Sequence, residues 1–161
     1  MKKLIYTLLI IIALTNNSFS AGSSSDNDST PKVSDYKKAK NLIKAAKKYE
    51  KKGKVEKAQK RYAKAQKLLL KSNDKKPLQA DTLNYLGFTT RKLGDYEGGE
   101  KFYLQGLQIE PNHNGINEYL GELYVATNRM DMAKERLEVL KTCNCEEYEA
   151  VSYTHLRAHE T

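Results

Sequence analysis

Residues 83–111 read LNYLGFTTRKLGDYEGGEKFYLQGLQIEP and carry the strongest structural signal in the chain. Apolar residues recur here at three-and-four spacing on both sides of Gly94-Asp95-Tyr96, and Pro111 closes the stretch. This spacing predicts two helices joined by a short turn. The same pattern extends back to Tyr36 and forward beyond Pro111. We therefore expect the chain from Tyr36 onward to be almost wholly helical.

This stretch is one copy of a repeat. The aligned pairs are Tyr85/Tyr119, Leu86/Leu120 and Gly87/Gly121 at an offset of 34 residues, and Gly53/Gly94, Glu56/Glu97 and Tyr62/Tyr103 at an offset of 41. A period in the thirties predicts stacked helical hairpins. We place the copies at 39–72, 80–113 and 114–147. The seven-residue insertion 73–79 equals about two helical turns, so it can lengthen the preceding helix without rotating the next copy.

The copies resemble the tetratricopeptide repeat, which places a bulky residue and Leu-Gly on its first helix, and Ala, an aromatic residue and Ala on its second. The middle copy matches this pattern at Leu83, Leu86, Gly87, Gly99, Tyr103, Gly106 and Pro111. The resemblance implies an all-α, right-handed solenoid of three such hairpins, with six to seven helices within 36–150. Small residues such as Gly87 and Gly99 would let paired helices approach closely.

The inner wall of such a solenoid is lined by the first helix of each hairpin. We predict that the wall consists of Lys40, Lys47, Asn84, Tyr85, Phe88, Arg91, Glu118, Tyr119 and Glu122. An aromatic centre between a lysine wall and a glutamate wall suits a protein or peptide partner, because aromatic side chains supply contact area at low entropic cost. Alternatively, Tyr85 and Tyr119 pack against the neighbouring hairpin.

Some members of the family hold a C-terminal carboxylate with Lys and Asn from the first hairpin, Asn from the second, and Lys and Arg from the third. Four of these places are occupied here by other residue types, namely Ile43, Tyr85, Gly115 and Tyr119. We therefore expect no carboxylate clamp of this kind.

The sequence offers little for catalysis, and we expect a protein that is not an enzyme and uses no cofactor. His113 follows Pro111 in a predicted loop with no nucleophile pattern around it. Cys143 and Cys145 are too few to complete a metal site, so they form either a disulfide or two thiols. Related exported repeat proteins carry such a pair, and this resemblance implies the disulfide.

The N-terminus, MKKLIYTLLIIIALTNNSFSA, combines two lysines, an apolar run and small polar residues, as in a signal peptide. The apolar run Leu4 to Leu14 is shorter than the roughly twenty residues that a membrane-spanning helix needs, which disfavours a permanent anchor. We expect the protein to be exported to a bacterial periplasm and residues 1–20 to be removed during export. The cleaved protein would then have no transmembrane segment. Residues 21–35 are then a flexible spacer rich in Ser and Asp.

The last eleven residues, VSYTHLRAHET (151–161), continue no pattern of the repeats. They correspond to the translation of a transposon-end adapter used in DNA sequencing libraries, whereas the alternative is a natural tail. We interpret them as an adapter artefact and expect the natural protein to continue differently beyond about residue 150.

Charge is distributed unevenly along the 161 residues, whose net charge is +8. Residues 36–72 contain 15 Lys and Arg against 2 Asp and Glu, a net charge of +13, whereas 73–150 carry a net charge of −5. The first hairpin is therefore either a solvated lysine-rich face or an alternative binding surface for anionic envelope lipid or polysaccharide. Export and the lack of an aromatic stacking platform among these lysines disfavour nucleic acid.

Overall fold

Seven helices make up the fold in the computed structural model, which describes residues 33–143 and 145–159. They are α1 (Asp35–Glu50), α2 (Val55–Lys75), α3 (Ala80–Lys92), α4 (Tyr96–Ile109), α5 (Asn114–Ala126), α6 (Met130–Leu140) and α7 (Glu146–His159). No strand occurs in these residues, which confirms the predicted all-α class. The predicted signal peptide and most of the spacer lie outside the described residues. Within those residues, no helix combines the length and apolar character needed to cross a bilayer.

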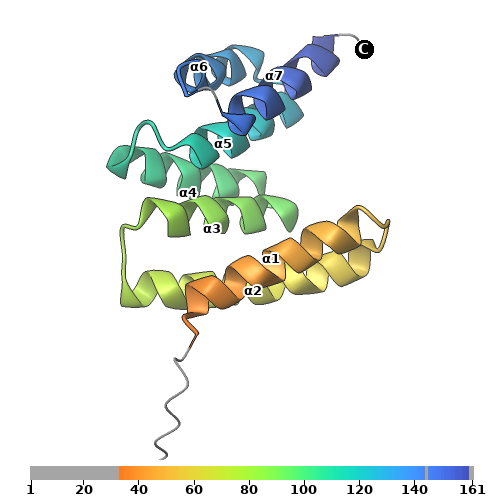
Figure 1. Cartoon of the computed structure of the whole chain (residues 1–161), viewed down its shortest axis with the longest axis vertical. Helices are drawn as coiled ribbons and strands as arrows, with labels where there is room; N and C mark the ends of the chain where they lie inside the picture. Colours follow the sequence, from red (N-terminus) through yellow and green to blue (C-terminus); the bar gives the residue numbers. More distant parts are fainter. Residues whose placement is uncertain (1–32, 144, 160–161) are drawn as a thin grey trace, which may run out of the picture. The chain divides into compact units, whose positions relative to one another are not determined.

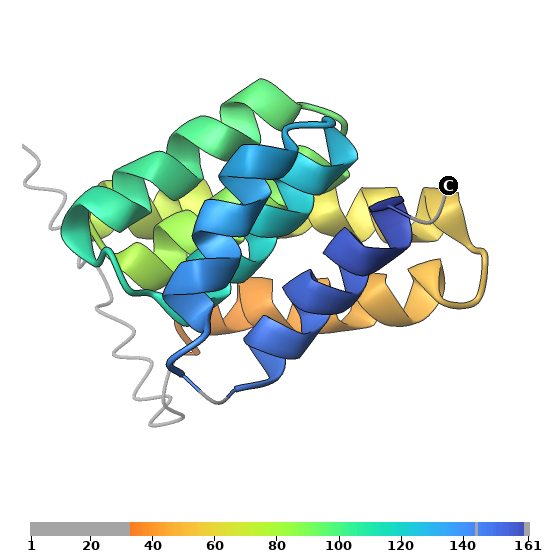
Figure 2. The same cartoon turned by 90° about the horizontal axis from the view of Figure 1, so that it is seen from above.

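The helices pair as three successive hairpins, α1–α2, α3–α4 and α5–α6 (Figure 1). The hairpins stack because α2 contacts α3 and α4 contacts α5, while α3 also contacts the other two first helices, α1 and α5. Helix α7 packs on α5 and α6, as the view from above also shows (Figure 2). The predicted repeat starts at 80 and 114 coincide with the first residues of α3 and α5.

Each hairpin turns at a residue in the left-handed region of backbone conformation. Gly53 and Gly94 have φ angles of +67° and +99°, and the equivalent residue of the third hairpin, Asn128, has a φ of 57°. Glycine adopts this conformation without steric cost, and asparagine is one of the few other residues that adopts it readily. The third copy therefore keeps the turn without the glycine.

The insertion 73–79 extends α2 to Lys75 and then forms a short return to α3. Leu78 in this return is exposed and has a φ of 59°, so the chain reverses direction through a left-handed residue. The predicted lengthening of the adjoining helix thus accounts for the first three inserted residues, and the loop accounts for the rest.

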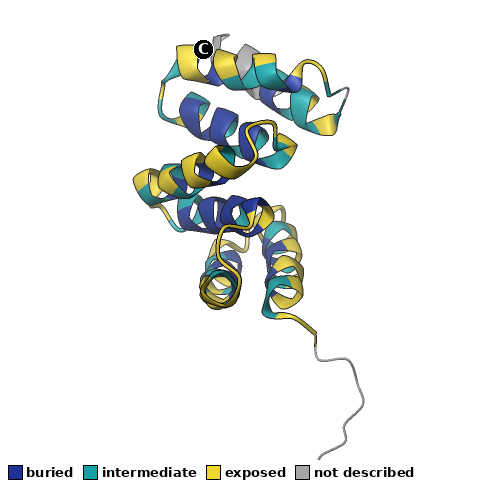
Figure 3. Ribbon diagram, turned by 90° about the vertical axis from the view of Figure 1, so that its left-hand side faces the viewer, coloured by how far each residue is buried: buried dark blue, intermediate teal, exposed yellow. Residues whose placement is uncertain are grey.

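Helix α3 is the most buried helix of the stack, because it contacts elements on several sides (Figure 3). Nine of its thirteen residues are buried, whereas only Gly99, Tyr103 and Gly106 are buried on α4. The Gly87 backbone lies directly against the Tyr103 ring: a Cβ atom added to Gly87 would lie 2.6 Å from Tyr103 Cδ1 and 2.8 Å from Cζ. A Cβ on Gly99 would lie 3.0 Å from the Gly87 carbonyl oxygen.

The C-terminal helix extends beyond the boundary that the sequence suggested at residue 150. Helix α7 continues to His159, and Val151 is fully buried. A Cβ atom on Gly121 would lie 3.0 Å from Val151 Cγ1, so this valine packs where α5 exposes its backbone. The predicted repeat region, 36–150, therefore ends within this helix. The adapter origin of 151–161 stays a prediction about the gene.

We predict that Gly87→Ala destabilises the protein by about 1–3 kcal/mol, because the added methyl group overlaps a buried ring that cannot move away freely. The gain in helix propensity from Gly to Ala, at most about 1 kcal/mol, offsets only part of this cost. Urea denaturation followed by circular dichroism measures the change.

The matched control is the double variant Gly87→Ala/Tyr103→Leu, which removes the ring that the methyl group meets. Its free energy of unfolding should fall by less than the sum of the two single changes. Strict additivity of the two changes would contradict the proposed overlap.

Candidate functional site

Two adjoining pockets lie on the side of the stack formed by the first helices. The larger, which we call the acidic pocket, has a volume of about 540 Å³ and is lined by Asp81, Asn84, Tyr85, Glu110, Asn112, His113, Asn114, Gly115, Glu118, Tyr119 and Glu147. The smaller, the mixed pocket, has a volume of about 210 Å³ and is lined by Lys47, Glu50, Lys51, Phe88, Lys92, Glu118, Tyr119 and Glu122. Glu118 and Tyr119 belong to both pockets, so we treat the two as one groove.

The structure brings most of the predicted wall together in this groove. Of the nine predicted residues, the acidic pocket contains Asn84, Tyr85, Glu118 and Tyr119, and the mixed pocket adds Lys47, Phe88 and Glu122. Arg91 lines neither pocket but holds Glu122 through an ion pair. Lys40 is exposed, and its Nζ lies 5.7 Å from the centre of the Tyr85 ring.

The aromatic residues differ in what they offer a ligand. Phe88 is only 2% exposed, and its ring lies between Tyr62 and Tyr119, with centroid distances of 5.7 and 4.8 Å. It therefore forms the floor of the mixed pocket and belongs to the core. Tyr85 and Tyr119 are half-buried, and each contacts an aromatic ring of the preceding hairpin, Tyr36 for Tyr85 and Phe88 for Tyr119. Tyr85 and Tyr119 thus pack against the neighbouring hairpin and also line the groove, so both alternatives that the sequence left open apply to them.

The cations predicted on the wall are largely engaged within the protein. Lys47 donates a hydrogen bond of 3.0 Å to the Tyr119 hydroxyl, and its Nζ lies 4.6 Å from the centre of the Phe88 ring. Arg91 donates from Nη2 to Glu122 Oε2 over 2.7 Å, with only 10% of its side chain exposed. These contacts fix α1, α3 and α5 relative to one another and leave little free positive charge at the centre of the groove.

Glu118 is the carboxylate at the junction of the two pockets. Burial, together with the nearby Glu122 and Glu147, raises the pKa of Glu118 to about 7, against the opposing effect of Lys47 and Arg91. No hydrogen bond or ion pair to its carboxylate occurs within the described part of the chain. Glu118 is thus a partly desolvated acid without a fixed partner, on the surface where a ligand would lie.

Asn84 of α3 also lines the acidic pocket. It is 5% exposed, and its Oδ1 atom has no hydrogen-bond partner among the described residues. A Cβ on Gly115 would lie 2.7 Å from Asn84 Nδ2, so the absence of a side chain at 115 makes room for this amide. A buried amide oxygen without a donor costs free energy that a bound N–H group would recover.

Several members of the acidic pocket were not predicted from the sequence. His113 is the N-cap of α5: its Nδ1 accepts a hydrogen bond from the Ile116 N–H at 3.1 Å, and its Nε2 lies 3.4 Å from Asp81 Oδ1. The sequence placed it in a loop with no nucleophile pattern around it, so the cap was not predicted. Glu147 comes from α7, whose packing no repeat pattern predicted. The position of His113, three residues before a buried Ile116, was the available signal for the cap.

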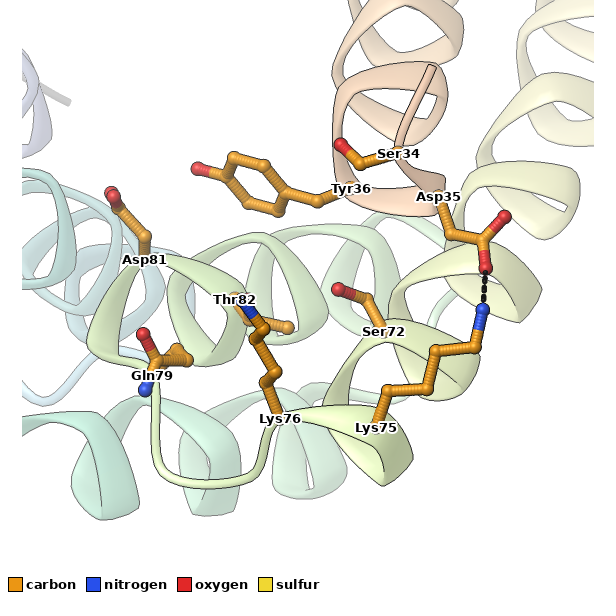
Figure 4. Close-up of a pocket in the computed structure, with 9 residues that line it drawn as sticks. All are labelled: Ser34, Asp35, Tyr36, Ser72, Lys75, Lys76, Gln79, Asp81 and Thr82. Carbon is orange, nitrogen blue, oxygen red and sulfur yellow. Dashed lines mark hydrogen bonds and ion pairs between the residues drawn. The ribbon is translucent and has the colours of Figure 1, made fainter. Parts of the chain in front are cut away.

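A further pocket of about 370 Å³ lies between the start of α1 and the insertion (Figure 4). Its lining residues are Ser34, Asp35, Tyr36, Ser72, Lys75, Lys76, Gln79, Asp81 and Thr82. Lys75 Nζ donates to Asp35 Oδ2 over 2.8 Å and thereby ties α2 to α1. Four of the nine lining residues, Ser72, Lys75, Lys76 and Gln79, belong to the insertion or directly precede it, so the extension of α2 contributes to this pocket.

Cys143 and Cys145 are joined by a disulfide in the structure, at the connection between α6 and α7. Of the two alternatives that the sequence left open, the structure contains the bonded one. The bond closes a short loop next to the helix that supplies Glu147 to the acidic pocket.

No protein-family model and no curated protein matches the chain. Among solved structures, it is similar to one described as the first TPR of Spaghetti (RPAP3) bound to HSP90 peptide SRMEEVD, with a TM-score of 0.50 and 20% sequence identity. The match covers 80% of this chain and 98% of that chain. At this identity the likeness concerns the fold alone: the chain is an all-α helical-repeat solenoid whose fold is similar to that of a TPR domain, the fold class that the sequence predicted.

We predict that the contribution of Glu118 to the free energy of unfolding falls as the pH rises from about 4.5 to about 7. The folded protein holds a proton on Glu118 up to its raised pKa of about 7, whereas the unfolded chain releases it near the model-peptide value of 4.5. In this range the folded state binds more protons, so its free energy of unfolding decreases with pH.

Glu118→Gln should remove this contribution and make the protein more stable than the parent at pH 8, but not at pH 4. Denaturant midpoints measured at several pH values compare the parent, Glu118→Gln and the control Glu97→Gln, whose carboxylate is exposed on α4. A parent and a Glu118→Gln variant with parallel pH profiles would contradict the assignment.

Proposed function

We propose that this protein is a protein-interaction module that binds an extended protein segment along the groove and catalyses no reaction. The observation that supports it best is the pair of adjoining pockets on the first helices, which share the half-buried Tyr119. Together they offer a continuous surface with aromatic, carboxylate and amide groups, which suits side chains and backbone of a peptide better than one compact small molecule. The solved structure of similar fold is described as having a peptide bound.

The proposed segment is not anchored by a C-terminal carboxylate. Ile43, at a place where the carboxylate-binding members carry a lysine, is buried at 4% exposure. Lys47 and Arg91, the cations nearest the groove centre, are occupied by Tyr119 and Glu122. A free carboxylate that binds Lys47 or Arg91 would have to displace one of these contacts, whereas an internal stretch of chain would not. The lysine-rich surface of α1 and α2 remains a separate prediction that rests on charge alone.

We predict that Tyr85→Ala and Tyr119→Ala each weaken segment binding about tenfold, because aromatic groove residues supply most of the contact area. The matched control is Tyr96→Ala, which removes the same side chain from the outer helix α4, where Tyr96 is 42% exposed. Peptides are first selected with the parent protein from a random twelve-residue display library. Their affinities for the folded variants are then measured by fluorescence anisotropy.

Phe88 is left unchanged in this experiment, since its removal would create a core cavity and confuse binding with folding. Equal affinity for the parent, both groove variants and Tyr96→Ala would overturn the proposed groove. Binding that depends only on ionic strength, without loss in the tyrosine variants, would instead support a lysine-rich surface on the first hairpin.

We further propose that the protein works outside the cytoplasm, in a bacterial periplasm. The signal-like residues 1–20 and the Cys143–Cys145 disulfide support this location, because disulfides persist in oxidising compartments. Expression in a bacterial host should give a periplasmic product that begins at Ala21 by mass spectrometry and has no titratable thiol. An intact N-terminus in the cytoplasmic fraction, with two free thiols, would contradict this location.

A further inference from the structure

The acidic pocket collects carboxylates from four different segments. Asp81 comes from α3, Glu110 from the connection between α4 and α5, Glu118 from α5 and Glu147 from α7. No lysine or arginine is among the lining residues, and His113, the one basic side chain there, is used as a helix cap and lies beside Asp81. The adjoining mixed pocket differs, because Lys47, Lys51 and Lys92 line it together with its glutamates.

Asn84 supplies an observation that does not depend on charge. Its side chain lines the acidic pocket, is 95% removed from solvent and carries an amide oxygen without a donor. A group that brings N–H donors into this pocket would therefore meet an amide oxygen and several carboxylate oxygens. Lysine ammonium and arginine guanidinium groups carry only donors, three and five respectively.

The rings of Tyr85 and Tyr119 complete the lining. Lys40 Nζ and Lys47 Nζ of the protein already lie 5.7 and 5.2 Å from the centres of the Tyr85 and Tyr119 rings. What these rings offer a bound basic side chain is therefore apolar cover for its methylene groups. A bare metal ion fits less well, because no group of three or more His, Cys, Asp or Glu side chains in the described residues is arranged to hold one. The carboxylates of the acidic pocket line a space but do not converge on one point. Such a spread suits an organic cation with several N–H donors better than a single metal ion.

We propose that the acidic pocket binds a lysine or arginine side chain of the partner segment. This assignment rests on the proposed function, since it requires a segment in the groove. In a carboxylate clamp, cations of the protein hold a carboxylate of the ligand. In the acidic pocket the charges are reversed, and carboxylates of the protein hold a cation of the ligand. Glu118 and Glu147 carry the recognition, and Tyr85 and Tyr119 flank the stem of the bound side chain.

The test uses the full chain and the same twelve-residue random display library. Peptides selected by the parent protein should be enriched in lysine or arginine at one shared position. Glu118→Gln and Glu147→Gln should each bind these peptides about tenfold more weakly, the loss expected for one charge-assisted hydrogen bond. The control variants Glu97→Gln and Glu149→Gln remove an exposed carboxylate from α4 and from α7 and should bind as the parent does.

A second readout changes the ligand instead of the protein. Replacing the shared arginine by citrulline, or the shared lysine by norleucine, removes the charge and keeps most of the shape. This replacement should weaken binding to the parent by more than tenfold, because it removes the charge that both carboxylates recognise. Its effect on binding to Glu118→Gln should be about tenfold smaller than on the parent, because one of the two carboxylate contacts is already lost there.

The possible failures are distinguishable. Selected peptides that lack a shared basic residue, or that bind Glu118→Gln and Glu147→Gln as tightly as the parent, would overturn the basic-side-chain assignment and leave the groove intact. Peptides that bind the parent no better than Tyr85→Ala and Tyr119→Ala would overturn the proposed function itself. Loss of binding in Glu149→Gln equal to that in Glu147→Gln would show a general charge effect and would also overturn the assignment.

Discussion

The close approach of α3 and α4 is the contact on which the rest of the structure depends. Gly87 and Gly99 remove side-chain bulk where the two backbones cross, and the Tyr103 ring fills the space that remains. Because α3 is also packed against α1, α2 and α5, a change in its distance from α4 would shift both neighbouring hairpins. Most groove residues come from α1, α3 and α5, so the geometry of the groove depends on the close helix packing at these two glycines.

The electrostatics of the groove follow from that packing. Once α1, α3 and α5 are held side by side, Lys47 reaches the Tyr119 hydroxyl and Arg91 reaches Glu122. These pairs use up the positive charge at the centre and leave Glu118 without a fixed partner, which burial and the neighbouring glutamates push towards the protonated state. A basic first hairpin therefore coexists with an acidic pocket, and the net charge of the chain describes neither.

The C-terminal helix shows how far one element can alter a site. Helix α7 covers α5 with Val151, at the place where Gly121 exposes its backbone, and brings Glu147 into the acidic pocket. The sequence predicted six to seven helices within 36–150 but gave the seventh helix no packing partner. Amphipathic periodicity gives the presence of a helix, but the partner of a helix outside the repeat depends on which surface of the stack is left uncovered.

The sequence by itself determined the helical content, the hairpin register and the positions of the turns, because these depend on local spacing of small, apolar and left-handed residues. It also located most of the groove, since first helices line the same face in every hairpin. Only the tertiary structure decided that Phe88 is core while Tyr85 and Tyr119 remain accessible, that His113 caps α5, and which charges cancel. These outcomes depend on distances between side chains from different hairpins, and periodicity along the chain does not fix those distances.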